Sequence, residues 1–214
     1  MSARSPWRHL LYKNLATISL SGDVIDLGGS RKSAYYKNFK GEFSLAVANM
    51  DDDTKDITVD LEQPFPIEAS KYDHVLCINV LEHIFNYQNV IHETQRILKP
   101  GGQALFAVPF LIQVHPSPHD YWRFTGETLN RLFSEAGFTQ VTVEPIGTGV
   151  CSAIVQMKSN LLHFHFLRHL ASWLAFTGDA ILARLYKKPT FSKEFYTLGY
   201  VIKAKKWVLI SQRK

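Results

Sequence analysis

Cysteine is scarce in this chain of 214 residues, which contains only Cys77 and Cys151. Two cysteines without a CxxC pair exclude a disulfide framework and a cysteine-based zinc site, so a reducing intracellular setting is expected. No apolar run reaches the roughly 18–20 residues that a membrane-spanning helix needs. The apolar stretch 10–20 is interrupted by Lys13 and Asn14 and does not resemble a signal peptide. We therefore expect a soluble, cytoplasmic protein, with peripheral membrane contact as an alternative.

Long runs of charge are also missing. Lysine and arginine number 24 against 19 acidic residues, which leaves a net charge of +5. The basic segments at 187–188 and 203–206 are short, and no Asn-Pro-Pro-Tyr signature of base methylation occurs, so no nucleic-acid partner is expected. Hydrophobic residues make up 46% of the chain, which excludes a disordered protein and is enough for one domain with a sizeable core.

Apolar runs of strand length alternate with helical patterns over most of the chain. Most of these runs lack polar alternation, which is typical of strands buried on both faces of a parallel sheet. The expected strands cover 23–27, 44–48, 56–60, 74–79, 103–109, 140–144 and, near the end, 197–204. The spacing of apolar residues predicts a helix over 87–98, ended by Lys99-Pro100-Gly101-Gly102, and another that begins at the N-cap Thr125 and ends before Gly137.

This alternation predicts an α/β fold, a doubly wound Rossmann-like sheet with helices on both faces. A helical lead-in over 1–21 precedes the main domain at 22–214. Residues 148–196 break the rhythm with a long apolar, helix-compatible segment, so we expect a late helical insert there. It is interpreted as a cover for the sheet or a dimer face, or alternatively as a substrate lid or membrane-surface helix.

Ligands of open α/β sheets bind beyond the carboxyl ends of the strands. The first strand runs into Asp26-Leu27-Gly28-Gly29-Ser30, where glycine lets a ligand approach the backbone and a following helix start would offer free N–H groups. Asn49 ends the second strand and Asp60 the third, with Asp51–Asp53 close by. These side chains suit the ribose hydroxyls and the amino group of a nucleoside cofactor. NAD is disfavoured because Gly28 is not followed by the third glycine of GxGxxG.

Several motifs occur together in the order and spacing of class I S-adenosylmethionine-dependent methyltransferases, and the chain most resembles the type 11 group. The matching segments are Val24-Ile25-Asp26-Leu27-Gly28-Gly29, Asp60-Leu61-Glu62-Gln63-Pro64-Phe65-Pro66, Tyr72-Asp73-His74-Val75-Leu76-Cys77, Val80-Leu81-Glu82-His83-Ile84, Arg96-Ile97-Leu98-Lys99-Pro100-Gly101-Gly102 and Ala136-Gly137-Phe138. The resemblance covers about residues 20–147. It implies a mostly parallel sheet with an antiparallel last strand, and S-adenosylmethionine as the cofactor.

The resemblance also implies a role for individual residues. Around the methionine moiety it places Asp26, Gly28, Gly29 and Ser30, with Asn79 and Val80 bordering the sulfonium. Asn49 would face the ribose, unless Asp51 takes its place, and Asp60 and Leu61 would contact adenine. Two departures from the family pattern are Ser30, where the second loop glycine is usual, and Asn49, where an acid is usual. These departures leave open the alternative that the protein binds the cofactor but does not catalyse methyl transfer.

Candidate reactive groups cluster at 115–125, directly after the fifth strand. In-line methyl transfer needs positioning, and a base where the acceptor carries a proton. His119 is the expected base, with Asp120 orienting it or binding the acceptor, and with His115 and Tyr121 beside them. The alternative is that Asp120 simply pairs with Arg123.

The insert holds His163, His165 and His169, but no carboxylate or third ligand on one face, so no metal is expected. The predicted function is methyl transfer to a small-molecule, sugar or lipid-linked acceptor by a monomer or homodimer. The second alternative is a membrane-peripheral interaction protein that acts through residues 150–190.

Overall fold

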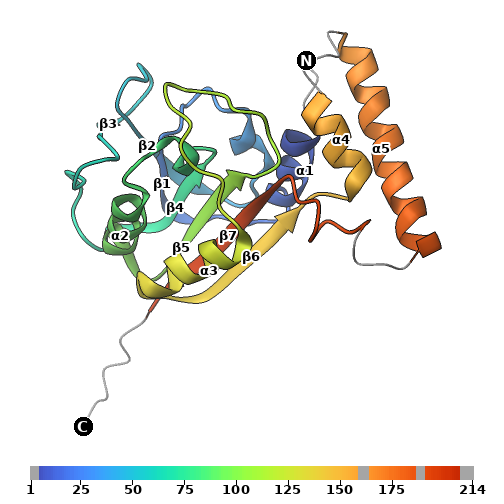
Figure 1. Ribbon diagram of the computed structural model, residues 1–214. Helices are drawn as coiled ribbons and strands as arrows, with labels where there is room; N and C mark the ends of the chain where they lie inside the picture. Colours follow the sequence, from blue (N-terminus) through green and yellow to red (C-terminus); the bar gives the residue numbers. More distant parts are fainter. Residues whose placement is uncertain (1–4, 159–163, 187–190, 208–214) are drawn as a thin grey trace.

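A computed structural model describes residues 5–158, 164–186 and 191–207 and has a seven-stranded sheet at its centre (Figure 1). The strand order is β3-β2-β1-β4-β5-β7-β6, and β7 runs antiparallel to both of its neighbours while the other pairs are parallel. The fold expected from the sequence is therefore confirmed. The strands are β1 (Gly22–Leu27), β2 (Phe43–Asn49), β3 (Ile57–Thr58), β4 (Tyr72–Ile78), β5 (Leu98–Pro109), β6 (Phe138–Ile146) and β7 (Gly199–Lys206).

Both faces of the sheet are covered. Along β5, Ala104, Phe106 and Val108 belong to one apolar cluster, whereas Leu105 and Ala107 belong to a second cluster. The first cluster includes residues of α2 and α3, and the second includes residues of α1, η1 and α4. Such two-sided burial explains the uninterrupted apolar runs of the strands. The helices are α1 (Pro6–Leu15), η1 (Ala34–Asn38), η2 (Leu81–His83), α2 (Tyr87–Ile97), α3 (Gly126–Glu135), α4 (Val150–Lys158) and α5 (His165–Tyr186).

The two predicted helices of the main domain are present, with the expected ends. In α3, the N-cap Thr125 accepts a hydrogen bond from the Thr128 N–H, and Gly137 adopts a φ of 86° directly after the helix. Gly101 has a φ of 80° in the turn that follows α2. That turn lies inside β5, which begins at Leu98 and carries a register irregularity, so the strand starts earlier than predicted.

Two local expectations are wrong. Instead of a helix start directly after Gly28–Gly29, the chain forms only the five-residue 3-10 helix η1, which begins at Ala34. The predicted strand 56–60 shortens to β3, because Asp56 turns its carboxylate onto Arg31 (2.6 Å) and onto the Val47 N–H (2.7 Å). The second change occurs at the β2–β3 edge, where local side-chain bonds compete with regular backbone pairing.

The late helices α4 and α5 pack against each other beyond the β6 side of the sheet (Figure 1). The buried carboxylate of Asp179 on α5 joins them, since it accepts hydrogen bonds from the Cys151 N–H (2.8 Å), the Ser152 N–H (3.0 Å) and the Thr148 hydroxyl (2.7 Å). These donors lie at the start of α4, where helix N–H groups lack intrahelical partners. Among the described helices, none is long and apolar enough to cross a membrane.

Candidate functional site

A cavity of about 760 Å³ opens at the carboxyl ends of β1, β2 and β4. At this point the strand order reverses, because β1 pairs with β2 on one side and with β4 on the other. The volume is in the range of small-molecule and cofactor sites. It is lined by Gly28, Asn49, Met50, Asp51, Asp52, Val59, Asp60, Leu61, Glu62, Asn79, Val80, His83, Ile84, Ser117, Pro118 and His119.

Most of the residues that the resemblance implies for the cofactor line this cavity. They are Gly28, Asn49, Asp60, Leu61, Asn79 and Val80. Gly28 has a φ of 73°, and a Cβ there would lie 2.7 Å from a Val80 methyl carbon, so only glycine fits. Ser30 and Gly29 stand outside the lining. The Ser30 hydroxyl lies 3.2 Å from that of Thr54 and helps to hold the neighbouring loop.

Asp26 also lies behind the cavity wall. Its side chain is fully buried, and the hydroxyls of Tyr35 and Tyr36 both donate hydrogen bonds to Oδ2. Burial raises the pKa of Asp26 to about 6, although the two hydrogen bonds partly oppose this rise. A Cβ on Gly29 would lie 2.0 Å from the Asp26 carboxylate, which explains the second glycine of the loop. The carboxylate thus supports the loop from beneath.

Asn49 connects the loop after β1 to the loop after β2. Its amide Nδ2 donates to the Gly29 carbonyl (2.8 Å), and its Oδ1 accepts from the Asp51 N–H (3.2 Å). The neighbouring Asp52 accepts from the Thr54 N–H (2.6 Å), and hydrogen bonds from Thr54 lower its pKa. Asp51 lines the cavity and is exposed. Its carboxylate is therefore less constrained in position than the side chains of Asn49 and Asp52.

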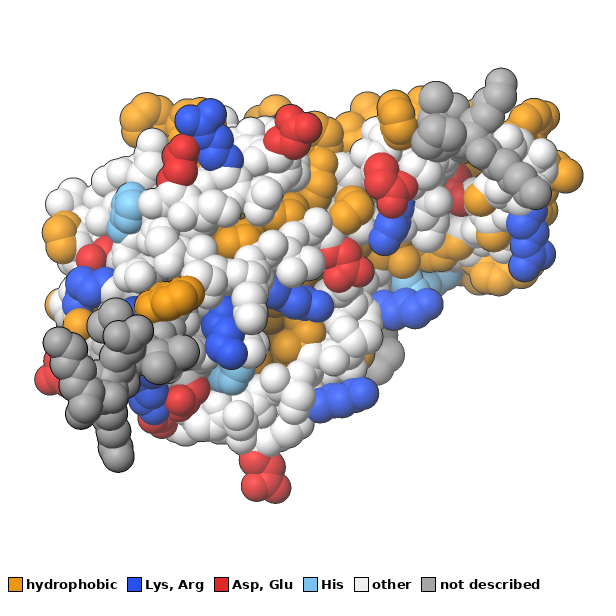
Figure 2. Space-filling view, turned by 90° about the horizontal axis from the view of Figure 1, so that it is seen from below, with side chains coloured by type: hydrophobic (Ala, Val, Ile, Leu, Met, Phe, Trp, Pro, Cys, Tyr) orange, Lys and Arg blue, Asp and Glu red, His pale blue; other side chains and the backbone are white. Residues whose placement is uncertain are grey.

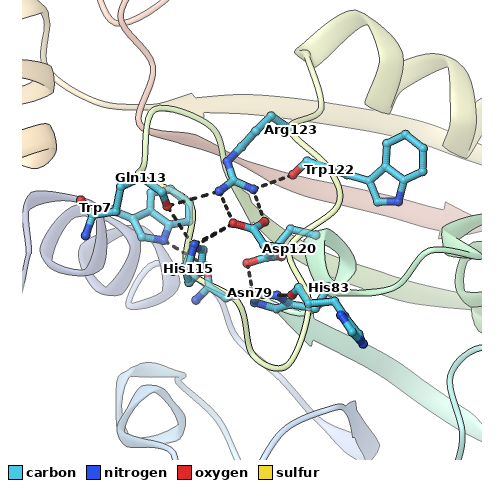
Figure 3. Close-up of polar contacts among 10 residues, drawn as sticks. Trp7, Asn79, His83, Gln113, His115, Asp120, Trp122 and Arg123 are labelled. Atoms are coloured by element: carbon cyan, nitrogen blue, oxygen red, sulfur yellow. Dashed lines mark hydrogen bonds and ion pairs between the residues drawn. The ribbon is translucent and has the colours of Figure 1, made fainter.

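Asn79 at the end of β4 is held by the N-terminal helix, a contact that sequence reasoning missed. Asn79 adopts a φ of 55°, and its Oδ1 accepts a hydrogen bond from the Trp7 indole N–H (3.0 Å) (Figure 3). The backbone N–H of Trp7 donates to Gln156 on α4 (3.0 Å). The N-terminal helix therefore helps to set the left-handed backbone at Asn79, which an L-residue adopts rarely.

The segment after β5 folds over one end of the cavity. Figure 3 shows Asp120 between Arg123 and His115. The Arg123 guanidinium donates to both Asp120 oxygens (2.5 and 2.7 Å), and Asp120 also accepts from the His115 N–H (2.9 Å). Hydrogen bonds from Arg123 hold the pKa of the Asp120 carboxyl well below its usual range. The ion pair expected as an alternative is present, and Asp120 lies beside His115 rather than orienting His119.

His119 itself lines the cavity with Ser117 and Pro118. Its ring centroid lies 5.3 Å from that of Tyr121, and the Tyr121 ring also packs on Phe85. Tyr121 is 43% exposed and does not line the cavity. Of the four residues expected to be catalytic, the structure therefore brings only His119 to the cavity wall.

Glu82 was not singled out from the sequence, although it belongs to the matching segment 80–84. Its side chain is fully buried, and this burial raises the pKa of Glu82 to about 8. Its backbone carbonyl accepts from the N–H groups of Tyr121 (2.9 Å) and Trp122 (3.2 Å), which anchors the segment above the cavity. Next to it, Nδ1 of His83 lies 2.5 Å from the His119 carbonyl. A buried acid in a tight turn gives no periodic signal in a sequence.

The comparisons with known proteins agree on one family. A family model described as a methyltransferase domain matches residues 2–143. Curated relatives include ubiquinone biosynthesis O-methyltransferases. That of Klebsiella pneumoniae is 29% identical over 104 residues, covering 46% of this chain and 43% of the relative. That of Burkholderia pseudomallei is 26% identical over 161 residues, covering 64% and 69%. The chain thus spans less than half the length of the Klebsiella relative.

Solved structures share the fold at low identity. The cyclase SpnF superposes with a TM-score of 0.61 at 15% identity, covering 97% of this chain and 86% of that one. A SAM-dependent methyltransferase of Archaeoglobus fulgidus gives 0.57 at 15% identity, covering 92% and 94%. A Haemonchus contortus phosphoethanolamine N-methyltransferase, solved with S-adenosylhomocysteine, gives 0.55 at 13% identity, covering 93% and 52%. At such identities the likeness concerns the fold alone.

The buried Asp26 predicts a pH dependence of stability. Because its pKa rises from 3.8 to about 6 on folding, the protonated form favours the native state, and this contribution is lost as pH rises through 6. The Asp26→Asn variant keeps an acceptor for the tyrosines without the charge. Relative to this variant, the wild-type free energy of unfolding should fall by up to about 3 kcal/mol between pH 4 and pH 7. Urea titrations at several pH values measure this, and parallel curves would contradict it.

Proposed function

Because the chain belongs to the methyltransferase domain family, we propose that its cavity binds S-adenosylmethionine and that the protein transfers the methyl group to an acceptor. The family confirms the resemblance found in the sequence. The observation that carries the proposal is the convergence of the ends of β1, β2 and β4 on one cavity of about 760 Å³. In-line displacement at a sulfonium carbon needs positioning above all, and a preformed cavity supplies it.

We assign each part of the cofactor to residues of the cavity lining. The backbone at Gly28 would lie against the methionine moiety, and Asn79 and Val80 would border the sulfonium. Asp51 would bind the ribose hydroxyls, because the amide of Asn49 is already engaged with Gly29 and Asp51. At the opposite end Asp60 and Leu61 would contact adenine, and the Asp60 carboxylate is oriented by the Glu62 N–H (2.9 Å). Asp26 would act indirectly, by supporting the loop.

A hydroxyl oxygen is the favoured acceptor. The curated relatives are named as O-methyltransferases, and a hydroxyl, unlike a tertiary amine, must lose a proton during transfer. His119 lies in the cavity wall and would accept that proton. Asp120 would hold His115 in place, and Tyr121 would shield the entrance with Phe85. Small-molecule, sugar and lipid-linked hydroxyls all satisfy this chemistry.

A second role, contact with a membrane surface, is supported by the outer side of α5. Large apolar side chains are exposed there, and they gather over the helical pair at the right of Figure 2. A monomeric protein rarely exposes so many apolar groups on one element without an interaction. The exposed set on α5 is Phe166, Leu167, Leu170, Trp173, Leu174, Ile181, Leu185 and Tyr186, and Phe164 is exposed directly before the helix. His163 and the side chain of His165 lie outside the described residues.

Cofactor binding is tested by calorimetric titration with S-adenosylhomocysteine. The wild-type protein should bind it and should not bind NAD. Asp60→Ala should weaken binding by about 10-fold or more, as expected for the loss of a charge-assisted hydrogen bond. Asp53→Ala serves as the control, because Asp53 is exposed in the neighbouring loop and does not line the cavity. Failure of the wild-type protein to bind would contradict the proposal.

The role of His119 is tested by turnover. With an acceptor found by screening hydroxylated compounds for release of S-adenosylhomocysteine, His119→Ala should lower the rate by about 100-fold or more. Affinity for S-adenosylhomocysteine should stay within about 2-fold, since the proposed role of the imidazole is toward the acceptor and not toward the cofactor. The exposed His92 provides the matched control His92→Ala. An unchanged rate would exclude His119 as the base, and binding without turnover for any acceptor would favour a module that only binds the cofactor.

Membrane contact is tested by co-sedimentation with vesicles of phosphatidylcholine and phosphatidylglycerol. Replacing Phe166 and Trp173 by Ser should lower binding by at least about 10-fold, because each buried apolar side chain contributes roughly 1.5–3 kcal/mol. Trp207→Ser is the control, since Trp207 is 57% exposed at the end of β7. Vesicle binding that does not change in the double variant would exclude α5, and a change in sedimentation equilibrium instead would identify a homodimer face.

A further inference from the structure

Three potential metal ligands meet at the acceptor end of the cavity. One ligand atom each from Glu82, His83 and His115 lies within 4.8 Å of the other two. The Glu82 side chain is fully buried, and neither of its carboxylate oxygens has a hydrogen-bond partner among the residues that the structure describes. A buried carboxylate without a partner is costly, so such a group is typically paired with a cation or coordinates a metal.

Both histidines are oriented by oxygen acceptors at Nδ1. In His83, Nδ1 lies 2.5 Å from the His119 carbonyl, and Nε2 lies 3.6 Å from Glu82 Oε1. In His115, Nδ1 lies 3.2 Å from the Gln113 carbonyl and 3.4 Å from Asp120 Oδ2. A proton on Nδ1 of each ring satisfies these contacts and leaves the Nε2 lone pair for another ligand. Metal-binding histidines are held in the same way, by a carbonyl or carboxylate on the second nitrogen.

The charges around the cluster are compatible with a bound cation. A further carboxylate, that of Asp120, lies 3.4 Å from Nδ1 of His115, and Arg123 already pairs with it through both oxygens. The Glu82 carboxylate oxygens receive no hydrogen bond from the described residues, and Nε2 of His83 lies 3.6 Å from Oε1. Protonation would remove the negative charge of Glu82, but the neutral acid would still hold buried oxygens without a hydrogen-bond partner. A divalent cation would satisfy the carboxylate and both imidazoles together.

We propose that Glu82, His83 and His115 bind one divalent transition-metal ion at the acceptor end of the cavity. Two imidazoles and one carboxylate suit a borderline ion such as Zn²⁺, and three protein ligands leave positions open. Because His83 lines the cavity, an acceptor oxygen can reach an open position. This inference departs from the expectation that no metal is present. Its catalytic consequence rests on the proposed methyl transfer.

The site would select acceptors that carry an oxygen ligand. An acceptor hydroxyl bound to the ion loses its proton to His119, and its oxygen attacks the methyl carbon of the sulfonium. As the new C–O bond forms, the C–S bond breaks and its electron pair stays on sulfur, which yields neutral S-adenosylhomocysteine. A bound cation lowers the pKa of a coordinated hydroxyl, so the oxygen becomes a better nucleophile at neutral pH.

Metal binding is tested without turnover, by titrating chelator-treated full-length protein with Co²⁺ and recording its visible absorption. The wild-type protein should bind one ion per chain, and Zn²⁺ should displace it. Glu82→Gln and His115→Ala should each weaken Co²⁺ binding by about 100-fold or more, because a direct ligand matters at least as much as the groups that orient it. The exposed His92 gives the control His92→Ala, which should bind Co²⁺ like the wild-type protein.

Each outcome decides between the alternatives. Absence of a Co²⁺ signal in the wild-type protein, or a signal that persists in both ligand variants, would overturn the proposed site. If Glu82→Gln fails to fold by circular dichroism, His115→Ala still tests the site, since the His115 side chain is 37% exposed. Titration with S-adenosylhomocysteine in the metal-free protein keeps the two proposals apart. Cofactor binding without metal binding would reject the ion and leave the methyltransferase proposal standing.

Discussion

Strand β1 hydrogen-bonds to β2 on one side and to β4 on the other, in parallel on both sides, and the site depends on this pairing. It brings the carboxyl ends of three strands to one edge of the sheet. Gly28 follows β1, Asn49 ends β2 and Asn79 follows β4, although the three residues are far apart in the sequence. The strands keep this register because both of their faces are buried, and a shift by one residue would turn apolar side chains onto the wrong face.

The segment Glu82–Ile84 connects the two halves of the site. It follows β4, lines the cavity through His83 and Ile84, and accepts hydrogen bonds from the segment after β5. The Glu82 carbonyl receives the N–H groups of Tyr121 and Trp122, and the Ile84 carbonyl receives the Trp122 indole N–H (3.1 Å). This single 3-10 turn therefore anchors the segment that carries His119 at the cavity wall.

The parts of the fold that the sequence predicted are those that depend on local patterns. The apolar stripe of α2, the Thr125 cap and the glycine at 137 are local signals, and all are present in the structure. The strand-end residues followed from the topology rule for parallel sheets. Errors arose where a distant partner decides the conformation. Asp56 binds Arg31, 25 residues earlier in the chain, instead of extending β3. Asp120 binds Arg123, the pair that the sequence offered as an alternative, and also the His115 N–H.

The contacts that sequence reasoning missed also link the late helices to the site. Gln156 on α4 accepts the Trp7 N–H, and the Trp7 indole donates to Asn79 at the cavity. Met157 on α4 lines a smaller hollow of about 140 Å³ together with residues 110–113, the start of the segment that carries His119. The helical pair thus contacts the site through two separate routes. Since α5 is joined to α4 by the buried Asp179, α5 is connected through α4 to Asn79 and to residues 110–113.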